Sequence, residues 1–458
     1  MTEIDIEDEL VTRVEGHGNI VVDASDGELK DCEWQVVESP RFFESMLVGR
    51  GYEESHHVTA RICAICSVSH TVASLKATED AIGIGLSGQD ERLRKLALYA
   101  EILQSHVLHL GYLALPDLVG KQSVLGVAES NDDDVRTVVR LHRLGNELTA
   151  AVTGRSVHAQ RLLPGGFSRL PAEDELRDLR DRLADCWDDV EAVAALLAEL
   201  ADELPAFERE TEYVSLTHPD EYAFYDGTIY SSDAGEIPVS DYADVANEYV
   251  VDHSTAKFAR HERESYMVGA LARLNNNFDQ LSPRARDVAD RFGLHAPCHN
   301  PYLNNVAQLV EVVHLVEECE RILDALLEDG LDPQSDYHVP EVDVTAGRGV
   351  GAVEVPRGAL FHEYAYDDAG EVTDADCVIP TNQNHGNIQR DMEALVPELI
   401  GGSADGSGGA AADEAEVEQT LEMLVRAYDP CISCSTHYLD VEFVGDDDPD
   451  GGVRPDGE

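Results

Sequence analysis

The sequence is poor in positive charge. Lysine and arginine together number 33 against 91 aspartates and glutamates, which gives a formal net charge of -58 at pH 7. Lysine is much scarcer than arginine: the sequence has only Lys30, Lys76, Lys95, Lys121 and Lys257. A chain this acidic is repelled by phosphate backbones, so nucleic acid is excluded as a partner. In concentrated salt, screening weakens the repulsion among surface carboxylates, and the composition therefore indicates a halophilic origin.

Long hydrophobic runs are also missing. No apolar run approaches the roughly 18 residues that span a bilayer, and the start MTEIDIEDEL has neither the basic residues nor the apolar stretch of a signal peptide. We therefore expect a cytoplasmic protein without a membrane span. The nine cysteines are an odd number with uneven spacing. This favours reduced thiols and metal ligation over a disulfide framework.

Apolar residues recur at helical spacing through much of the chain. The helical segments predicted in this way are 55–82, 90–113, 133–160, 173–203, 254–279, 283–293, 301–330 and 413–427. Two short runs in which apolar and polar residues alternate flank an Asp-Gly turn, and they predict a β-hairpin over 18–38.

The segments between the predicted helices have other patterns. Residues 205–250 indicate irregular structure with short strands, 340–380 indicate turns and strands, and the Gly-rich stretch 401–411 indicates a flexible surface loop. No repeat of fixed period is present. We expect an α+β fold, predominantly α, in which a long-helix bundle carries small peripheral β-hairpins and sheets. Residues 1–437 would form one intertwined domain.

Two C-x-x-C motifs lie near opposite ends of the chain. RICAICSVSH (61–70) contains Cys63, Cys66 and His70, and DPCISCSTH (429–437) contains Cys431 and Cys434. Only the fold could bring the two pairs into one site. Four soft thiolates can hold zinc, an Fe-S cluster, or nickel with iron, and their number does not choose among these. A structural four-cysteine zinc site is the alternative, although the cysteine pairs of zinc ribbons usually lie closer in sequence.

Five motifs in a fixed order span nearly the whole chain and resemble those of nickel-iron hydrogenase large, catalytic subunits. They are RVEGHGNI (13–20), RICAICSVSH (61–70), EVPRGALFH (354–362), VIPTNQN (378–384) and DPCISCSTH (429–437). The segments ISCSTH and QNHGNIQRD look most like the cytoplasmic multimeric branch, which is NAD(P)-linked, deazaflavin-linked or of the sulfhydrogenase type. The resemblance implies the hydrogenase large-subunit fold and reversible heterolytic cleavage of hydrogen into protons and electrons.

The resemblance also implies a set of metal ligands. Cys63 and Cys431 match terminal nickel ligands, while Cys66 and Cys434 match the bridges between nickel and iron. The iron would carry carbon monoxide and cyanide ligands, which no side chain supplies. Bridging thiolates couple the two metals, and a thiolate can take the proton released when hydrogen is split.

Three charged residues match second-sphere positions of the family. Glu15 matches the glutamate that takes protons from Cys431, Arg357 matches an arginine over the open metal position, and Asp429 would pair with Arg357. Without the resemblance, Glu15 would be a local cap or pair at a strand start, and Arg357 a turn residue with a surface salt bridge. One departure is Ser105, where many members carry an aspartate.

Three uncharged positions complete the expected surroundings. His70 would hydrogen-bond a bridging cysteine, and Thr381, which follows Pro380, would hydrogen-bond an iron cyanide. The alternatives are a satisfied core histidine and a simple turn residue. Ala64 stands where the family usually has a glycine.

The resemblance implies a second metal site and a processing step. Glu44, the backbone carbonyl of Cys377 and His437 match ligands of a magnesium or iron ion, a donor set that suits a hard octahedral cation. Residues 438–458 extend past the point where mature large subunits end. We expect a maturation endopeptidase to remove this propeptide after His437; the alternative is an acidic tail that stays attached.

Electrons need a partner, because the cysteines outside the two pairs form no Fe-S motif. The resemblance implies a small subunit with Fe-S clusters and allows for diaphorase-type subunits that bind flavin and NAD(P). Two other functions compete. One is the structural zinc protein, and the other is a non-catalytic complex I-like core subunit, which would lack the four cysteines.

Overall fold

A computed structural model describes residues 4–25, 28–332, 342–401 and 412–436. His437, the expected propeptide 438–458 and the expected loop 401–411, apart from Gly401, lie outside the described residues. One continuous cluster of buried apolar side chains runs from Ile4 to Cys434. Within the described ranges, no helix is both long enough and apolar enough to cross a membrane.

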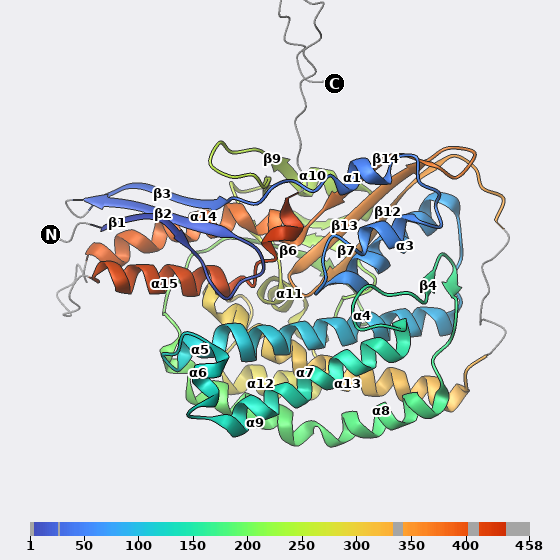
Figure 1. Ribbon diagram of the computed structural model, residues 1–458, viewed down its shortest axis with the longest axis horizontal. Coiled ribbons are helices and arrows are strands. Elements are labelled where there is room, and N and C mark those ends of the chain that lie inside the picture. The colour runs from blue at the N-terminus through green and yellow to red at the C-terminus, as the bar shows by residue number, and fades with distance from the viewer. Residues whose placement is uncertain (1–3, 26–27, 333–341, 402–411, 437–458) are drawn as a thin grey trace, which may run out of the picture.

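A helical bundle forms the lower half of the molecule (Figure 1). Its helices are α4 (Gly88–Leu108), α7 (Asp132–Thr153), α8 (Glu173–Asp185), α9 (Trp187–Glu199), α12 (Pro283–Arg291) and α13 (Asn304–Asp329). Ser87 caps the start of α4, since its hydroxyl accepts the backbone N–H of Asp90. Three aspartates in the first turn of α7 stabilise that helix by interacting with the positive end of its dipole. The predicted bundle is therefore confirmed.

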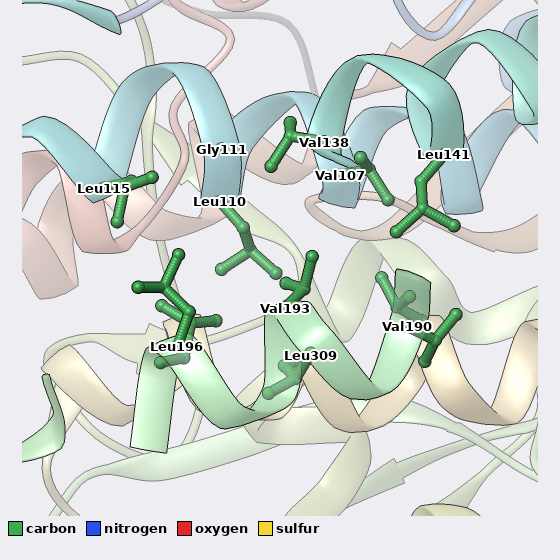
Figure 2. A pocket seen from close by; sticks show the side chains of 12 residues that line it. Val107, Leu110, Gly111, Leu115, Val138, Leu141, Val190, Val193, Leu196 and Leu309 are labelled. Carbon is green, nitrogen blue, oxygen red and sulfur yellow. The ribbon is translucent and has the colours of Figure 1, made fainter. Parts of the chain in front are cut away.

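At its end, α4 widens into a π-helix, η1 (His109–Ala114), which leads into α5 (Leu115–Leu118) and α6 (Val124–Ala128). α7 packs closely here, since a Cβ on Gly111 would lie 2.1 Å from Cγ1 of Val138. Beside this contact, α4, η1, α7, α9 and α13 enclose a small apolar cavity (Figure 2). Side chains such as Leu110, Leu141 and Val190 point into it.

The upper half is built on an antiparallel sheet of β12 (Gly347–Val355), β13 (Gly358–Tyr366) and β14 (Val372–Val378), in that order. Helix α3 (Ser67–Ile82) lies directly on β12. Glycines at alternate positions make this possible: a Cβ on Gly349 would lie 2.6 Å from the carbonyl oxygen of Ala77, and one on Gly351 would lie 2.0 Å from that of Ala73.

The N-terminal sheet, β1 (Ile4–Leu10), β2 (Gly18–Ser25) and β3 (Glu28–Val36), confirms the predicted hairpin. It packs on α14 (Pro380–Gly401) and α15 (Glu414–Ala427). A four-stranded sheet has the order β11-β6-β7-β8, from Tyr266–Met267, Glu212–Thr217, Thr228–Ser231 and Gly235–Ile237. β9 (Asn247–Tyr249) pairs with β10 (Phe258–Arg260), and β4 (Leu162–Leu163) pairs with β5 (Gly166–Phe167).

Short helices link these layers. They are α1 (Phe43–Leu47), α2 (Ser55–Thr59), α10 (Tyr242–Val245) and α11 (Ala270–Asn277), with the 3-10 turns Ala201–Glu203, Val239–Asp241, Phe278–Gln280, Pro301–Leu303 and η7 (Ile432–Ser435).

Several predicted boundaries were wrong. The helix predicted over 254–279 occupies only Ala270–Asn277, because pairing with neighbouring strands, a non-local effect, turns its first part into β10 and β11. The segment 55–82 breaks between α2 and α3. The segment 133–160 ends at Thr153, where Gly154 takes a left-handed φ of 84°, and 173–203 divides at Cys186.

Candidate metal centre

The four paired cysteines meet in one buried cluster. Their Sγ atoms all lie within 4.8 Å of one another, and those of Cys63 and Cys431 are 3.4 Å apart. Cys63 lies in the turn before α3 and Cys66 just precedes that helix, while Cys431 and Cys434 belong to the turn at η7. Across the described ranges, no other group of three or more histidine, cysteine or acidic side chains has metal-ligand geometry.

Backbone contacts close the cluster. Glu15 and Cys431 form a parallel β-bridge, and the N–H of Ile432 donates to the carbonyl of Glu15 at 2.9 Å. The N–H of Cys431 donates to Oγ1 of Thr381 at 3.1 Å. These contacts join two segments, one near the start of the chain and one at the start of α14, to the last described segment of the chain. They explain why motifs so distant in sequence share one site.

The charge balance of the thiols favours a bound cation. Hydrogen bonds with the other three cysteines, above all Cys431, lower the pKa of Cys63 well below its usual value. Burial raises the pKa of Cys434 well above its usual value. Four buried thiolates cannot all ionise together without a positive partner, because each added charge raises the pKa of the next. A soft metal ion supplies that partner, so the donor set fits nickel with iron.

A small cavity lies against the thiols. Its walls are Cys66, Cys431, Cys434, His70, Val355, Pro356, Arg357, Leu360, Ile379, Pro380 and Thr381. Most of this lining is apolar, which excludes bulk water beside the sulfur atoms.

Arg357 contributes a fixed charge to the cavity. Its Nε donates to the carbonyl of Asp429 at 2.6 Å, its Nη2 donates to Oδ1 of Asp429 at 2.9 Å, and its Nη1 donates weakly to Oγ of Ser105 at 3.4 Å. Burial would lower the pKa of Arg357, but Asp429 and the thiols raise it well above its usual value. The predicted Arg357–Asp429 pair is therefore present, with Ser105 beside it.

Glu15 reaches the cluster from the opposite direction. Sγ of Cys431 lies 3.2 Å from Oε2 of Glu15, which also accepts the N–H of Ser433 at 3.1 Å. The hydroxyl of Ser433 donates to Oε1 of the same carboxylate. Glu15 therefore contacts one thiol of the cluster directly, as the sequence predicts.

His70 lines the cavity together with Cys66 and Cys434. Its Nδ1 lies 3.1 Å from Nε2 of His362, and Nδ1 of His362 lies 2.6 Å from the hydroxyl of Tyr364. Burial lowers the pKa of His70 to about 4, so the ring is neutral near pH 7. His362, which sequence analysis missed, therefore fixes the orientation of this ring.

Glu101 is a second residue that sequence analysis missed. Its carboxylate accepts the N–H groups of Val68 at 2.6 Å and Ser69 at 2.7 Å, and so caps the start of α3, where no side-chain cap from Cys66 is present. Burial raises the pKa of Glu101 to about 8, although these hydrogen bonds act in the opposite direction. The available signal was one acidic residue inside the apolar stretch LALYAEIL.

Two of the residues predicted for the second metal site also meet. Oε1 of Glu44, in α1, accepts the N–H of Cys377 at 3.1 Å. Burial, with help from Asp376, raises the pKa of Glu44 to about 7. The third predicted ligand, His437, lies outside the described residues. The backbone N–H of Arg41 donates to the carbonyl of the preceding residue, Thr436, at 2.9 Å.

The chain matches known proteins over most of its length. A family model described as nickel-dependent hydrogenase covers residues 41–155 and 211–437, and one described as HoxL-like covers 4–39. The sulfhydrogenase 1 subunit alpha of Pyrococcus furiosus is 31% identical over 430 residues, 94% of this chain and 97% of that protein. The NAD-reducing hydrogenase HoxS subunit beta of Cupriavidus necator is 32% identical over 475 residues, 94% of each chain.

Solved structures agree. A crystal structure of an NAD+-reducing [NiFe]-hydrogenase in the H2-reduced state superposes with a TM-score of 0.83 at 29% identity, over 95% of this chain and all of that one. A [NiFeSe]-hydrogenase from Dm. baculatum, at 23% identity and a TM-score of 0.74, shares the fold. These matches confirm the family that the five motifs indicated and set aside the zinc protein and the complex I-like subunit. The chain belongs to the nickel-dependent hydrogenases as a large subunit, an oxidoreductase that acts on hydrogen and whose four-cysteine cluster fits a nickel-iron site.

Proposed function

We propose that this chain is the catalytic subunit of a multimeric, cytoplasmic [NiFe]-hydrogenase that passes electrons to an Fe-S small subunit. The observation that carries the proposal is the set of four buried thiols within 4.8 Å of one another, beside a largely apolar cavity. Residues 1–437 would act as one domain around this centre.

Each cysteine has a proposed role at the metals. Cys63 and Cys431 would be terminal ligands of nickel, and Cys66 and Cys434 would bridge nickel and iron. The bound centre, with carbon monoxide and cyanide on iron, supplies the electron-rich metals at which hydrogen is split. Thr381 and Pro380 line the cavity, and Oγ1 of Thr381 accepts the N–H of Cys431, so the hydroxyl proton of Thr381 would be available to hold a cyanide ligand of the iron.

Proton transfer would run from Cys431 to Glu15. A thiolate takes the proton that leaves hydrogen, and the carboxylate of Glu15, 3.2 Å from Sγ of Cys431, receives it next. The N–H and hydroxyl of Ser433 hold that carboxylate in place during the exchange.

Arg357 would act by its charge. Its guanidinium lines the cavity and is held by both the carbonyl and the carboxylate of Asp429. A guanidinium with a raised pKa does not serve as a base, so its role is to polarise hydrogen and to stabilise negative charge that develops during cleavage. His70 would tune the bridging thiolates from the same cavity.

The electrons would leave past Ala64. This residue is exposed between the two buried cysteines Cys63 and Cys66, so the cluster lies directly beneath the surface here. A small residue permits close approach of a partner, and we place the Fe-S small subunit over this face. The similarity to a subunit of an NAD-reducing hydrogenase supports further diaphorase-type subunits that bind flavin and NAD(P).

A magnesium or iron ion would occupy the second site. The Glu44 carboxylate, the Cys377 carbonyl and His437 would hold it together with waters, a donor set suited to a hard cation. We further propose that a maturation endopeptidase removes residues 438–458 after His437. The intact mass of the active subunit tests this step: a mass that ends at His437 supports removal, and a mass that includes the tail contradicts it.

Metal analysis and infrared spectroscopy of the complex, purified in high salt with its native partners, test the main proposal. We expect one nickel and one iron per large subunit together with sharp bands from metal-bound carbon monoxide and cyanide. The Cys434→Ser variant should lose both signals, whereas Cys298→Ser, at a cysteine outside the cluster, should keep them. Zinc alone, without such bands in the wild type, would contradict the proposal.

A further inference from the structure

A second buried arginine, Arg273, is bonded to the turn that carries Arg357. Arg273 belongs to α11, and its side chain is fully buried. Its Nη1 donates to the carbonyl of Val355 at 2.8 Å, and its Nη2 donates to the carbonyl of Pro356 at 3.2 Å. Val355 ends β12, and Pro356 directly precedes Arg357. One guanidinium therefore holds two consecutive carbonyls at the start of this turn.

Two carboxylates fix Arg273 in this orientation. Nε and Nη2 donate to the two oxygens of Glu311, each at 2.7 Å, and Nη1 donates to Oε2 of Glu354 at 2.8 Å. The bidentate contact with Glu311 sets the plane of the guanidinium as well as its position. Glu354 is itself anchored, because its Oε1 accepts the N–H of Leu216 at 2.7 Å. Together with the two carbonyls, these partners use every N–H group of the guanidinium.

Glu311 also ties α4 to this network. Its Oε2 lies 2.7 Å from Nε2 of His106, and its Oε1 accepts the hydroxyl of Tyr222 at 2.7 Å. His106 follows Ser105, the residue that Nη1 of Arg357 reaches. The same carboxylate is therefore bonded both to the arginine that holds the turn and to the helix beside the Arg357 side chain.

The turn has little room to move against α11. Gly269, which precedes this helix, takes a φ of 119°, and a Cβ there would lie 3.3 Å from the carbonyl oxygen of Arg357. The far end of the Arg357 side chain is held separately by Asp429, which also accepts from Nε2 of Gln308 at 3.1 Å. The backbone and the guanidinium of Arg357 thus have independent anchors.

We infer that Arg273 is a positioning residue for Arg357: by holding the carbonyls before it, Arg273 sets the point from which the Arg357 side chain enters the cavity beside the thiols. The inference rests on the proposed role of Arg357. A misplacement of about 1 Å in an active site can cost about 100-fold in rate, so the backbone anchor matters as much as the contact with Asp429.

Arg273→Lys tests the inference without any need for activity or a particular metal content. Lysine keeps the positive charge, but a single ammonium does not span the plane in which both carboxylates and both carbonyls lie. In the purified complex, the backbone amides of residues 357 and 358 should exchange with D2O at least about tenfold faster than in the wild type. Unchanged exchange at this turn would overturn the inference.

Tyr222→Phe is the matched control. It removes a buried hydrogen bond to the same carboxylate of Glu311, but it leaves both contacts between Arg273 and the turn. Exchange at residues 357 and 358 should therefore stay at the wild-type rate. Equal acceleration in Tyr222→Phe and Arg273→Lys would show a general loosening of the core and would also overturn the inference.

A double-mutant cycle separates positioning from general stability. Arg273→Lys should lower kcat for hydrogen turnover by about tenfold with nickel content retained. In the Arg357→Lys background the same change should cost less than about twofold, because the side chain that Arg273 positions is already gone. Equal losses in the two backgrounds would show that Arg273 acts by another route and would overturn the inference.

The remaining outcomes are also decisive. If Arg273→Lys does not assemble, Arg273→Gln combined with Glu354→Gln, which removes one charge of each sign, repeats both measurements. Failure of both variants to fold or to retain nickel would make Arg273 a residue of the fold alone and overturn the inference. A wild-type complex that carries nickel and iron but does not turn over hydrogen would defeat the proposed function instead.

Discussion

At the scale of single residues, the groups around the thiols divide by the kind of charge they bring. Glu15 contacts Sγ of Cys431 and can exchange a proton, while Arg357 is held as a permanent cation. In the proposed mechanism the two would act on opposite products of hydrogen cleavage, since Glu15 would receive the proton and Arg357 would stabilise electron density.

Replacing Glu15 by glutamine should separate proton transfer from metal binding. The amide keeps the size and the contact to Ser433, but it cannot receive a proton from Cys431. We expect hydrogen turnover to fall by at least about 100-fold, with nickel and iron content unchanged in the purified complex. The control is Glu38→Gln, since Glu38 bonds the exposed His17 instead. Equal activity in Glu15→Gln and the wild type would show that protons leave by another route.

Glu354 makes a pH-dependent contribution to stability. It shares Arg273 with Glu311, and all three side chains are fully buried. Burial raises the pKa of Glu354 to about 7, whereas Arg273 and His106 overcome burial and lower the pKa of Glu311 to about 2. A raised carboxyl pKa stabilises the fold fully below the unfolded pKa, and this contribution is lost as pH rises through the folded value.

In the wild type, Glu354 should make the free energy of unfolding fall as pH rises from about 4 to about 7. The Glu354→Gln variant should lack this fall. Relative to this variant, the wild type should lose up to about 3 kcal/mol of unfolding free energy over that range. Denaturant unfolding of both proteins in high salt measures the difference. Glu398→Gln, at an exposed site, should keep the wild-type slope. Parallel curves for Glu354→Gln and the wild type would contradict the assignment.

Sequence patterns reveal some of these residues and not others. The four cysteines, Glu15, Arg357 and Thr381 lie in short distinctive motifs, and the structure brings them together. Glu101 and Gln308 lie inside the long helices α4 and α13, where a polar residue in an apolar stretch indicates burial but not which group it contacts. Their partners come from distant segments, so only the packed structure reveals them.

At the scale of elements, the contact between α3 and β12 positions much of the site. α3 begins directly after Cys66 and carries His70, and β12 ends at the turn that contains Arg357. Glycine on the strand faces alanine on the helix, so backbone approaches backbone without intervening side chains. This packing sets the distance from the first cysteine pair to the arginine.

Gly351→Ala should disturb that distance. The added methyl would lie 2.0 Å from the carbonyl oxygen of Ala73, and neither backbone can move without shifting its element. We expect a loss of about 1–3 kcal/mol in unfolding free energy and reduced nickel occupancy. Gly88→Ala, where nothing lies within 4 Å of the new methyl, is the control and should leave both unchanged. If the two variants behave alike, close packing at β12 is not what positions the site.

Periodicity predicted most long helices because their buried faces repeat regularly. It failed for α14, whose first turns contain Asn382, Gln383 and Asn384 and therefore look polar, yet these side chains are buried. They bond backbone groups of other segments, as Asn384 does with both groups of Val268. The error over 254–279 has a similar cause, since pairing between distant strands outweighed a helical pattern there.

At the scale of the whole molecule, the net charge of -58 sets the conditions for stability. Repulsion among exposed carboxylates weakens as the screening length falls from about 10 Å at 0.1 M salt to about 3 Å at 1 M. We propose that the protein works in concentrated salt. The denaturant midpoint of the complex should rise steadily over this range, and a midpoint independent of salt would contradict the proposal.

Hydrogen isotope exchange tests the central claim most directly. The purified complex, held under D2 in H2O without an electron acceptor, should release HD as the bond is split heterolytically and the deuteron from the thiolate exchanges with solvent. Cys431→Ser should release none, because it removes the thiolate that contacts Glu15. Wild-type complex that carries nickel and iron yet forms no HD would contradict the account.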